Sequence, residues 1–360
     1  MTDLLYCEVE EELRASVRAL LRDRVDLSRV EGPEPVDLKL WRTLAADLGC
    51  AGLPVAEEAG GAGATWRETA VVMEELGRAV APVPFLGSAV LATAALPAGD
   101  PLLAQLASGA RSAALAVPLS TVPMPTGPMS TGNGLRWTVS ARDGRLDGEV
   151  TTVADALTAD VLLVPTVEGL FAVEGTAVVR TAVVSFDLTR PIADLAFREA
   201  PGRLVAGDAG PLVARALVTG AALLASEQLG IAEWCLETTV EYVKTRRQFA
   251  RQIGSYQAIK HRLADLWVSV TQARAVARYA ADCLATDDPD LPVAASLAQA
   301  FCSPVAIRAA EECVQLHGGI GFTWEHPAHW YLKRARANAA ALGSPTRHRA
   351  LLAELVDLPA

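Results

Sequence analysis

The residues best suited to hold a large anionic cofactor lie in two C-terminal segments. The first segment carries Arg246 and Phe249 within Tyr242-Val-Lys-Thr-Arg-Arg-Gln-Phe249. An arginine presents a permanently charged planar fork that matches a pyrophosphate, and a phenylalanine ring offers a face to a nucleotide. We therefore expect this segment, near a helix end, to bind the phosphates and the nucleotide of a cofactor.

The second segment reads Gln315-Leu-His-Gly-Gly-Ile-Gly-Phe322. Gly318 and Gly319 lack a Cβ atom, so the backbone there can approach a ligand closely and present its amides. Gln315, one turn earlier, adds a side-chain donor. A lone arginine is more often a solvated helix residue, and a lone Gly-Gly pair is usually a turn. The joint occurrence of the two segments is what favours a binding site.

Together the two segments closely resemble those of acyl-CoA dehydrogenases. The first continues through Gln257 to Asp265 and the second to Pro327, and the resemblance covers essentially the whole chain, most strongly from about residue 220 to 336. It implies an FAD cofactor, and a Gly-Gly loop that comes from the neighbouring subunit, so that the site is shared between subunits. The resemblance assigns the binding of the cofactor to Arg246, Phe249, Gln257, Gln315, Gly318 and Gly319.

The catalytic carboxylate of the resembled family is missing at both of its known positions. Family chemistry removes a proton next to a thioester carbonyl and passes a hydride to the flavin, which needs a carboxylate in a dry pocket. Registered on Leu332-Lys-Arg-Ala-Arg336, the usual glutamate corresponds to Leu342. The second position corresponds to about Gly220, in a stretch without an acid. No catalytic residue is therefore predicted at either position.

Glu227 is the fallback base, because it lies two turns beyond Gly220 on the same helix face. An acid in an alanine-rich helix is more often the partner of an arginine. The stretches that correspond to the flavin-ring contacts of the family, Leu115-Ala-Val-Pro118 and Val150-Thr-Thr-Val153, also depart from the family pattern. A general base contributes about 10²–10⁴-fold in rate. We therefore expect another chain to supply the base.

These departures favour one subunit of a flavin-dependent acyl-CoA dehydrogenase, the non-catalytic partner in an α2β2 heterotetramer. The resemblance is to bacterial enzymes that degrade steroid side-chain CoA esters, and a branched or ordinary fatty acyl-CoA is the alternative substrate. A homologous subunit would bring the glutamate, and an electron-transfer flavoprotein or similar acceptor would take the electrons. Two other interpretations stay open: a homotetrameric flavin enzyme with an unusual base such as Glu227 or a different flavin reaction, and a flavin-free assembly subunit.

Three segments must position these residues. Residues 1–110 show a helical period, as in Leu13, Val17, Leu20 and Leu21, and Thr65 with Glu68 predicts a capping box at a helix start. Residues 111–207 change to short runs rich in Val, Leu and Thr, which indicate a β domain.

The helical period returns over residues 208–360 and predicts an antiparallel bundle. The expected fold is therefore similar to acyl-CoA dehydrogenases: an N-terminal α-helical domain, a middle β domain and a C-terminal four-helix-bundle domain with the FAD-binding and oligomer contacts. Residues 121–134, rich in Pro, Gly, Ser and Thr, are expected to form an exposed loop.

Composition excludes several other classes of function. The net charge of -10 over 360 residues gives no basic footprint for nucleic acid or an anionic membrane surface. No run of about 18 uncharged apolar residues predicts membrane insertion, and the first residues lack a secretory pattern, so we expect a cytoplasmic protein. The six cysteines form no C-x-x-C pair, and His317, His326 and His329 lack suitable company, so no metal site is predicted.

Overall fold

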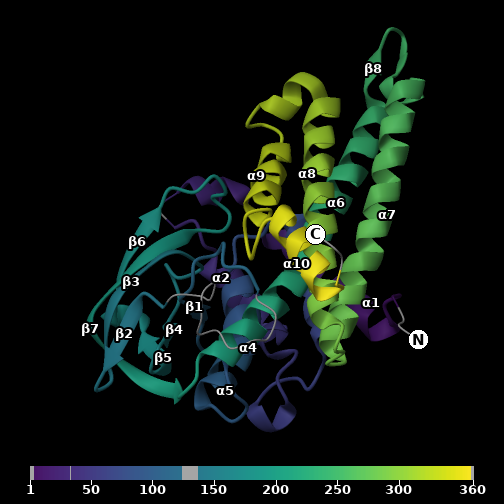
Figure 1. The fold of residues 1–360 in the computed structure, drawn as a ribbon. Coiled ribbons are helices and arrows are strands. Elements are labelled where there is room, and N and C mark those ends of the chain that lie inside the picture. Colours follow the sequence, from purple (N-terminus) through teal and green to yellow (C-terminus); the bar gives the residue numbers. More distant parts are fainter. Residues whose placement is uncertain (1–3, 33, 124–136, 358–360) are drawn as a thin grey trace.

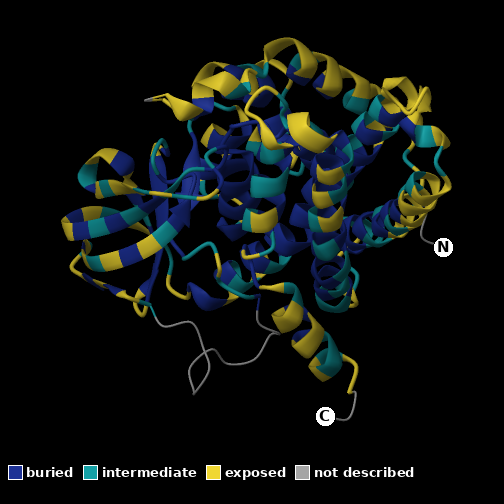
Figure 2. Ribbon diagram, turned by 90° about the horizontal axis from the view of Figure 1, so that it is seen from above, coloured by how far each residue is buried: buried dark blue, intermediate teal, exposed yellow. Residues whose placement is uncertain are grey.

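The computed structural model describes residues 4–32, 34–123 and 137–357, so most of the loop expected at residues 121–134 lies outside the described residues. A helical region, a sheet region and a second helical region follow one another along the chain (Figure 1). This order confirms the predicted fold class. Buried residues run through the middle of the molecule, and exposed residues follow the outer faces of the helices and strands (Figure 2).

The N-terminal region starts its helices where the sequence predicts them. Thr65 Oγ1 accepts a hydrogen bond from the amide of Arg67 at 3.1 Å, and Glu68 accepts from the amide of Thr65 at 2.9 Å, which completes the capping box. Val17 and Leu21 of the first helix are buried. The elements of this region are α1 (Glu8–Arg24), η1 (Leu27–Glu31), α2 (Leu38–Arg42), η2 (Thr43–Asp47), η3 (Cys50–Gly52), η4 (Glu57–Ala59), α3 (Trp66–Ala79), η5 (Leu86–Ala92), α4 (Thr93–Ala95) and α5 (Pro101–Ala107).

The middle region forms a sheet with the strand order β1-β4-β5-β7-β3-β2, and β6 also pairs with β7. The pair β1 and β4 is parallel, and the other pairs are antiparallel. The strands are β1 (Ala113–Leu115), β2 (Val139–Arg142), β3 (Arg145–Ala154), β4 (Val161–Thr166), β5 (Gly169–Glu174), β6 (Val179–Val183) and β7 (Ile192–Ala206). Alternate residues of the outer strand β2 are buried and exposed, the period expected of a half-buried strand.

The C-terminal region is built on three long helices that pack side by side, with two shorter helices against the third (Figure 1). Its elements are α6 (Gly210–Thr245), β8 (Arg247–Gln248), β9 (Arg251–Gln252), η7 (Ile253–Ser255), α7 (Gln257–Ala285), α8 (Leu291–His317), η8 (Gly318–Phe322), α9 (Ala328–Asn338) and α10 (Pro345–Leu355). Helices α6 and α8 each contain an apolar window long enough to cross a membrane, but 83% and 67% of those windows is buried inside the fold. Both are core helices.

Helices α3 and α6 cross at a point where each helix carries a glycine. A Cβ atom on Gly77 would lie 2.1 Å from the carbonyl oxygen of Glu227, and one on Gly230 would lie 1.9 Å from that of Glu74. Neither separation is possible for a carbon atom, so the two backbones approach this closely because glycine occupies both positions. The crossing fixes the N-terminal helices against the C-terminal bundle.

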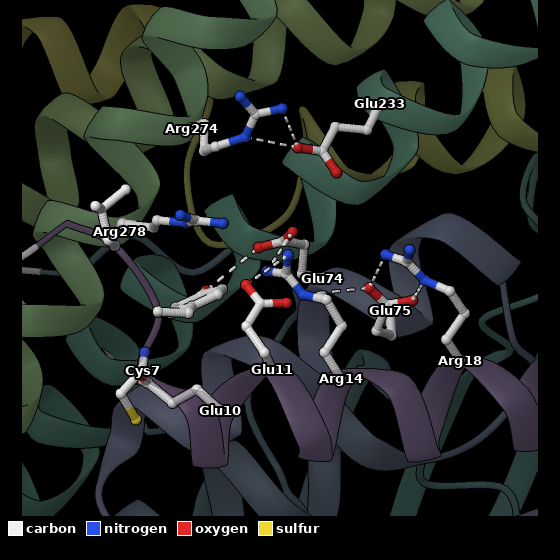
Figure 3. A network of polar contacts seen from close by, with 12 residues as sticks. Cys7, Glu10, Glu11, Arg14, Arg18, Glu74, Glu75, Glu233, Arg274 and Arg278 are labelled. Atoms are coloured by element: carbon white, nitrogen blue, oxygen red, sulfur yellow. Dashed lines mark hydrogen bonds and ion pairs between the residues drawn. The ribbon is translucent and has the colours of Figure 1, made fainter.

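Charged side chains surround this crossing (Figure 3). Arg14 of α1 donates to Glu74 Oε1 at 2.9 Å, and Arg18 donates to Glu75 Oε1 at 2.6 Å. On the other side, Arg274 of α7 donates to Glu233 Oε1 of α6 at 2.7 Å. Burial and the nearby Glu233 carboxylate raise the pKa of Glu74 to about 7, against the opposing effect of Arg14.

We predict that Glu74→Gln becomes more stable relative to the wild type as the pH rises. The pKa of Glu74 in the folded chain lies above the ordinary value of 4.5, so the folded chain keeps a proton that the unfolded chain releases, and wild-type stability falls between pH 4.5 and about 7. Glutamine does not titrate. Urea unfolding at several pH values measures the difference, which should grow by at most about 1.4 kcal/mol per pH unit.

The matched control is Glu11→Gln, which removes an exposed glutamate that also contacts Arg14, at 3.4 Å. A stability difference between Glu74→Gln and the wild type that stays constant across this pH range would contradict the prediction.

Candidate functional site

The predicted nucleotide-binding residues of the first segment lie where α6 ends and α7 begins. Arg246 leaves α6 in an extended conformation, and its amide donates to Tyr242 O at 2.9 Å. The β8–β9 hairpin follows, with Phe249 and Ala250 at positive φ in its two-residue turn, the conformation that suits a tight hairpin. Phe249 is 89% exposed, and Gln257 is exposed at the start of α7. All three predicted residues therefore face outward at one end of the bundle.

The second segment lies at the same end. Gln315, Gly318 and Gly319 are exposed at the end of α8, and Gly318 has a φ of +63°, which favours glycine. A Cβ on either glycine would meet nothing within 4 Å, so the backbone faces open space. The Tyr242 hydroxyl donates to His317 O at 3.3 Å and joins the ends of α6 and α8. The structure thus brings the two segments to one end of the bundle.

The two positions expected to hold a catalytic glutamate meet in the folded chain. A Cβ on Gly220 would lie 3.0 Å from Leu342 Cδ1 and 2.5 Å from Leu91 Cδ2. Leu342 is 1% exposed and has a φ of +53°. The contacts at this point are therefore between hydrocarbon groups, where the family chemistry requires a carboxylate.

The stretches that correspond to the flavin-ring contacts lie beside Leu342. The amide of Leu119 donates to Thr152 O at 3.0 Å, and the amide of Leu342 donates to Leu119 O at 2.7 Å. Thr152 has a positive φ at an irregularity in the pairing of β3 with β7. A cavity of about 140 Å³ opens here, well below the roughly 300–1,000 Å³ of typical ligand pockets. Its walls include Ala116, Val117, Pro118, Trp137, Val150 and Thr151.

Glu227 lies in a buried cluster of charged and amide side chains. Arg334 Nη1 and Asn338 Nδ2 of α9 each donate to Glu227 Oε1 at 2.9 Å. Arg190, which lies just before β7, donates to the other carboxylate oxygen. Arg334 also donates to Asp187 Oδ2 at 2.6 Å, so two arginines face two carboxylates. Both oxygens of Glu227 are therefore occupied by donors from its own chain.

This cluster keeps Glu227 ionised. Burial raises the pKa of Glu227, but the Arg190 and Arg334 guanidinium groups and the hydrogen bonds outweigh it and lower the pKa from 4.5 to about 2. A general base works best with a pKa near the operating pH. The electrostatics of Glu227 are the opposite of those a flavin dehydrogenase base requires.

The sequence pointed to Glu227 but not to its partners Arg190, Arg334 and Asn338. Two of these could have been found, because Arg334 and Asn338 are four residues apart and share one face of a helix. Arg190 follows the irregular stretch before β7, where no periodicity indicates which way a side chain points. Its position depends on how the sheet packs against the bundle.

The residues at the end of the helical bundle fit part of an FAD molecule, and those around Leu342 do not. The Arg246 guanidinium forms no hydrogen bond or ion pair within the described part of the chain, and Gly318 presents open backbone. The cavity beside residues 116–118 and 149–151 is small, and Leu342 is a buried apolar side chain. The residues present suit a pyrophosphate and a nucleotide, and they do not suit a reacting flavin ring.

Comparison with known proteins agrees with this architecture. The acyl-CoA dehydrogenase N-terminal domain model matches residues 8–103, and the C-terminal domain model matches residues 210–356. The chain is 37% identical over 345 residues to the acyl-CoA dehydrogenase IpdE2 of Mycolicibacterium smegmatis, covering 94% of this chain and 96% of that protein. It is also 37% identical over 314 residues to IpdE2 of Mycobacterium tuberculosis, covering 86% of this chain and 84% of that protein.

Two solved structures are similar over nearly the full length. The ChsE4-ChsE5 complex from Mycobacterium tuberculosis matches with a TM-score of 0.84 and 28% identity, covering 99% of this chain and 100% of that chain. The Tcur3481-Tcur3483 steroid ACAD G363A variant matches with a TM-score of 0.82 and 27% identity, covering 97% and 98%. By sequence and by fold, the chain belongs to the acyl-CoA dehydrogenase family, oxidoreductases that act on the CH–CH bond of acyl-CoA thioesters.

Proposed function

We propose that this chain is the subunit without a base in an acyl-CoA dehydrogenase built from two kinds of chain. The observation that carries the proposal is the contact between Leu342 and Gly220, because leucine and glycine occupy both positions from which the family glutamate would act. α,β-Dehydrogenation begins with loss of a proton next to the thioester carbonyl, and neither side chain can accept it. A homologous subunit would bring the glutamate.

Glu227 does not replace the missing base in this proposal. It lies about 10 Å along α6 from Gly220, at about 1.5 Å per residue. Its carboxylate is held by Arg190, Arg334 and Asn338, and its low pKa makes it a weak acceptor of a substrate proton. We infer that Glu227 has a structural role.

The chain would instead contribute the nucleotide half of a shared FAD site. Arg246 directly follows the last residue of α6, which puts it about 39 Å along the helix from Gly220 at a rise of about 1.5 Å per residue. An FAD whose pyrophosphate is bound at Arg246 would therefore have its flavin ring far from Leu342 of this chain and against another subunit. When bound, FAD supplies the hydride acceptor. The residues proposed to hold its nucleotide half are Arg246, Phe249, Gln257, Gln315, Gly318 and Gly319.

The similar complexes support the choice of partner and of substrate class. One is a complex of two named chains, ChsE4 and ChsE5, and the other, Tcur3481-Tcur3483, is a steroid ACAD. We propose an α2β2 heterotetramer that dehydrogenates a steroid side-chain or another bulky acyl-CoA, with an electron-transfer flavoprotein or similar acceptor, in the cytoplasm.

The first test is flavin content. We expect the purified lone chain to be colourless, and the chain co-expressed with its homologous dehydrogenase to carry one FAD for each pair of unlike chains. Arg246→Ala should lower the flavin absorbance of the complex, because it removes the charge-assisted hydrogen bonds to the pyrophosphate. Lys244→Ala, at an exposed cation that pairs with Glu241, is the control.

A homotetramer of the lone chain with a full complement of FAD would contradict the two-subunit proposal. A complex that stays colourless but assembled would instead indicate a flavin-free assembly subunit.

We predict that Leu342→Glu alone restores little activity to the lone chain. The new carboxylate would lie among hydrocarbon groups beside a small cavity, without the ring contacts that a reacting flavin needs. Turnover of an acyl-CoA with an artificial electron acceptor measures the outcome, and Leu342→Gln controls for the polar substitution. Turnover close to that of the complex would show that the ring site of this chain is intact.

We predict that Glu227→Gln destabilises the chain by about 3–5 kcal/mol, because two buried arginines lose an anionic partner. Urea unfolding near neutral pH measures the loss. The low pKa places this stabilisation above pH 4.5, with loss as the pH falls toward 2. Glu237→Gln, in a more exposed pair with Arg78, should cost about 0–1 kcal/mol. Unchanged stability together with lost activity would instead identify Glu227 as a base.

A further inference from the structure

A second cavity, of about 570 Å³, lies between the N-terminal helices and the first turns of α6. Its walls come from residues 54–59, from the start of α3, from α4, α5 and the first turns of α6, and from the turn between α7 and α8. This volume falls within the roughly 300–1,000 Å³ range of pockets that bind small molecules. None of the residues proposed to hold FAD lines it.

The walls are mainly apolar and many of the side chains are small. An apolar cavity offers water few hydrogen-bond partners, so a hydrocarbon ligand gains by entering it. Trp66 adds a broad aromatic face at the start of α3. Small or aliphatic lining residues include Val55, Ala59, Leu96, Ala214, Leu284 and Leu291.

Thr219 gives this cavity a specific polar feature. It is 1% exposed and lines the cavity, yet its hydroxyl forms no hydrogen bond within the described residues. Thr93, which also lines the cavity, instead donates to Ser88 O at 3.0 Å. Thr219 Oγ1 is not among the fully buried side-chain atoms without a partner, so this hydroxyl opens into the cavity. Because no group of the described residues pairs with it there, a ligand oxygen that enters the cavity, or a water, is its partner.

The charges at the cavity favour an uncharged ligand. The guanidinium of Arg215 donates to the carbonyl oxygens of Ala94 at 2.7 Å and of Leu96 at 2.8 Å, so it caps the end of α4. Asp287 lines the same cavity, and its charge offsets that of Arg215. A carboxylate ligand would gain from one of these groups and be repelled by the other.

We propose that this cavity binds an uncharged, mainly hydrocarbon small molecule that carries one hydroxyl or carbonyl oxygen, hydrogen-bonded to Thr219. The neighbouring residue Gly220 faces Leu91 and Leu342 instead, so the bound molecule lies apart from the positions of the family base. It would bridge the N-terminal helices and α6 and stabilise the chain. The proposal does not depend on flavin binding or on a partner subunit.

The test is binding of two probes to the purified full chain: progesterone, a rigid polycyclic ketone, and 1-dodecanol, a flexible alcohol. Equilibrium dialysis with radiolabelled probe measures affinity and stoichiometry, and thermal unfolding measures stabilisation. We expect saturable binding of one molecule per chain. Binding of progesterone alone assigns a polycyclic ligand, and binding of dodecanol alone assigns an extended chain.

Two variants tie the binding to this cavity. Thr219→Val keeps the shape of the side chain and removes the hydroxyl, and it should weaken binding about 3-fold to 10-fold. Ala214→Phe should abolish binding by filling the space. Thr271→Val, on the exposed face of α7, is the matched control and should bind as the wild type does.

Failure of both probes to bind would overturn the proposal, as would binding that survives Ala214→Phe in a folded chain. Unchanged affinity in Thr219→Val would overturn the hydrogen bond assigned to the hydroxyl. Because Thr219→Val conserves volume, it provides this test even where Ala214→Phe does not fold.

Discussion

The interaction on which the rest of this structure depends is the buried contact of Arg334 with Glu227 and Asp187. It joins α9, α6 and the segment before β7. The Arg334 side chain therefore connects two helices of the C-terminal region to the sheet region. Arg190 completes the charge balance. A buried ion is tolerated when its charge and its donors are all satisfied, and removal of one partner exposes the full cost of the others. The cluster therefore fixes the end of α9, and with it the turn that carries Leu342.

The glycine crossing supplies the second constraint. With no side chain at Gly77 or Gly230, α3 approaches α6 closely enough for Glu74 and Glu227 to lie on the two sides of one contact. Each carboxylate then needs its own arginine partners. Arg14 of α1 pairs with Glu74, and Arg334 of α9 and Arg190, just before β7, pair with Glu227. The close packing thus accounts for the concentration of buried charge in a chain whose core is otherwise aliphatic and rich in alanine.

The sequence predicted the fold class because its evidence is local or periodic. The capping box at Thr65 depends on residues three apart, and the residues proposed to hold a nucleotide lie in two short segments, each legible in the sequence by itself. The charge cluster and the 570 Å³ cavity were not predictable in this way, since both join elements far apart in the chain. Even the meeting of Gly220 with Leu342 needed the folded structure, although each position was found separately.

The backbone at Leu342 carries a further argument about the missing base. A leucine at a φ of +53° costs about 1 kcal/mol or more relative to ordinary conformations. The conformation is imposed by its neighbours: the amide donates to Leu119 O at 2.7 Å, and its carbonyl accepts from His348 Nε2 at 2.8 Å. Burial lowers the pKa of His348, which favours the neutral ring, against the opposing effect of its hydrogen bond to Leu342 O. Because hydrogen bonds and not the side chain define this turn, the residue there can change while the surrounding fold stays the same.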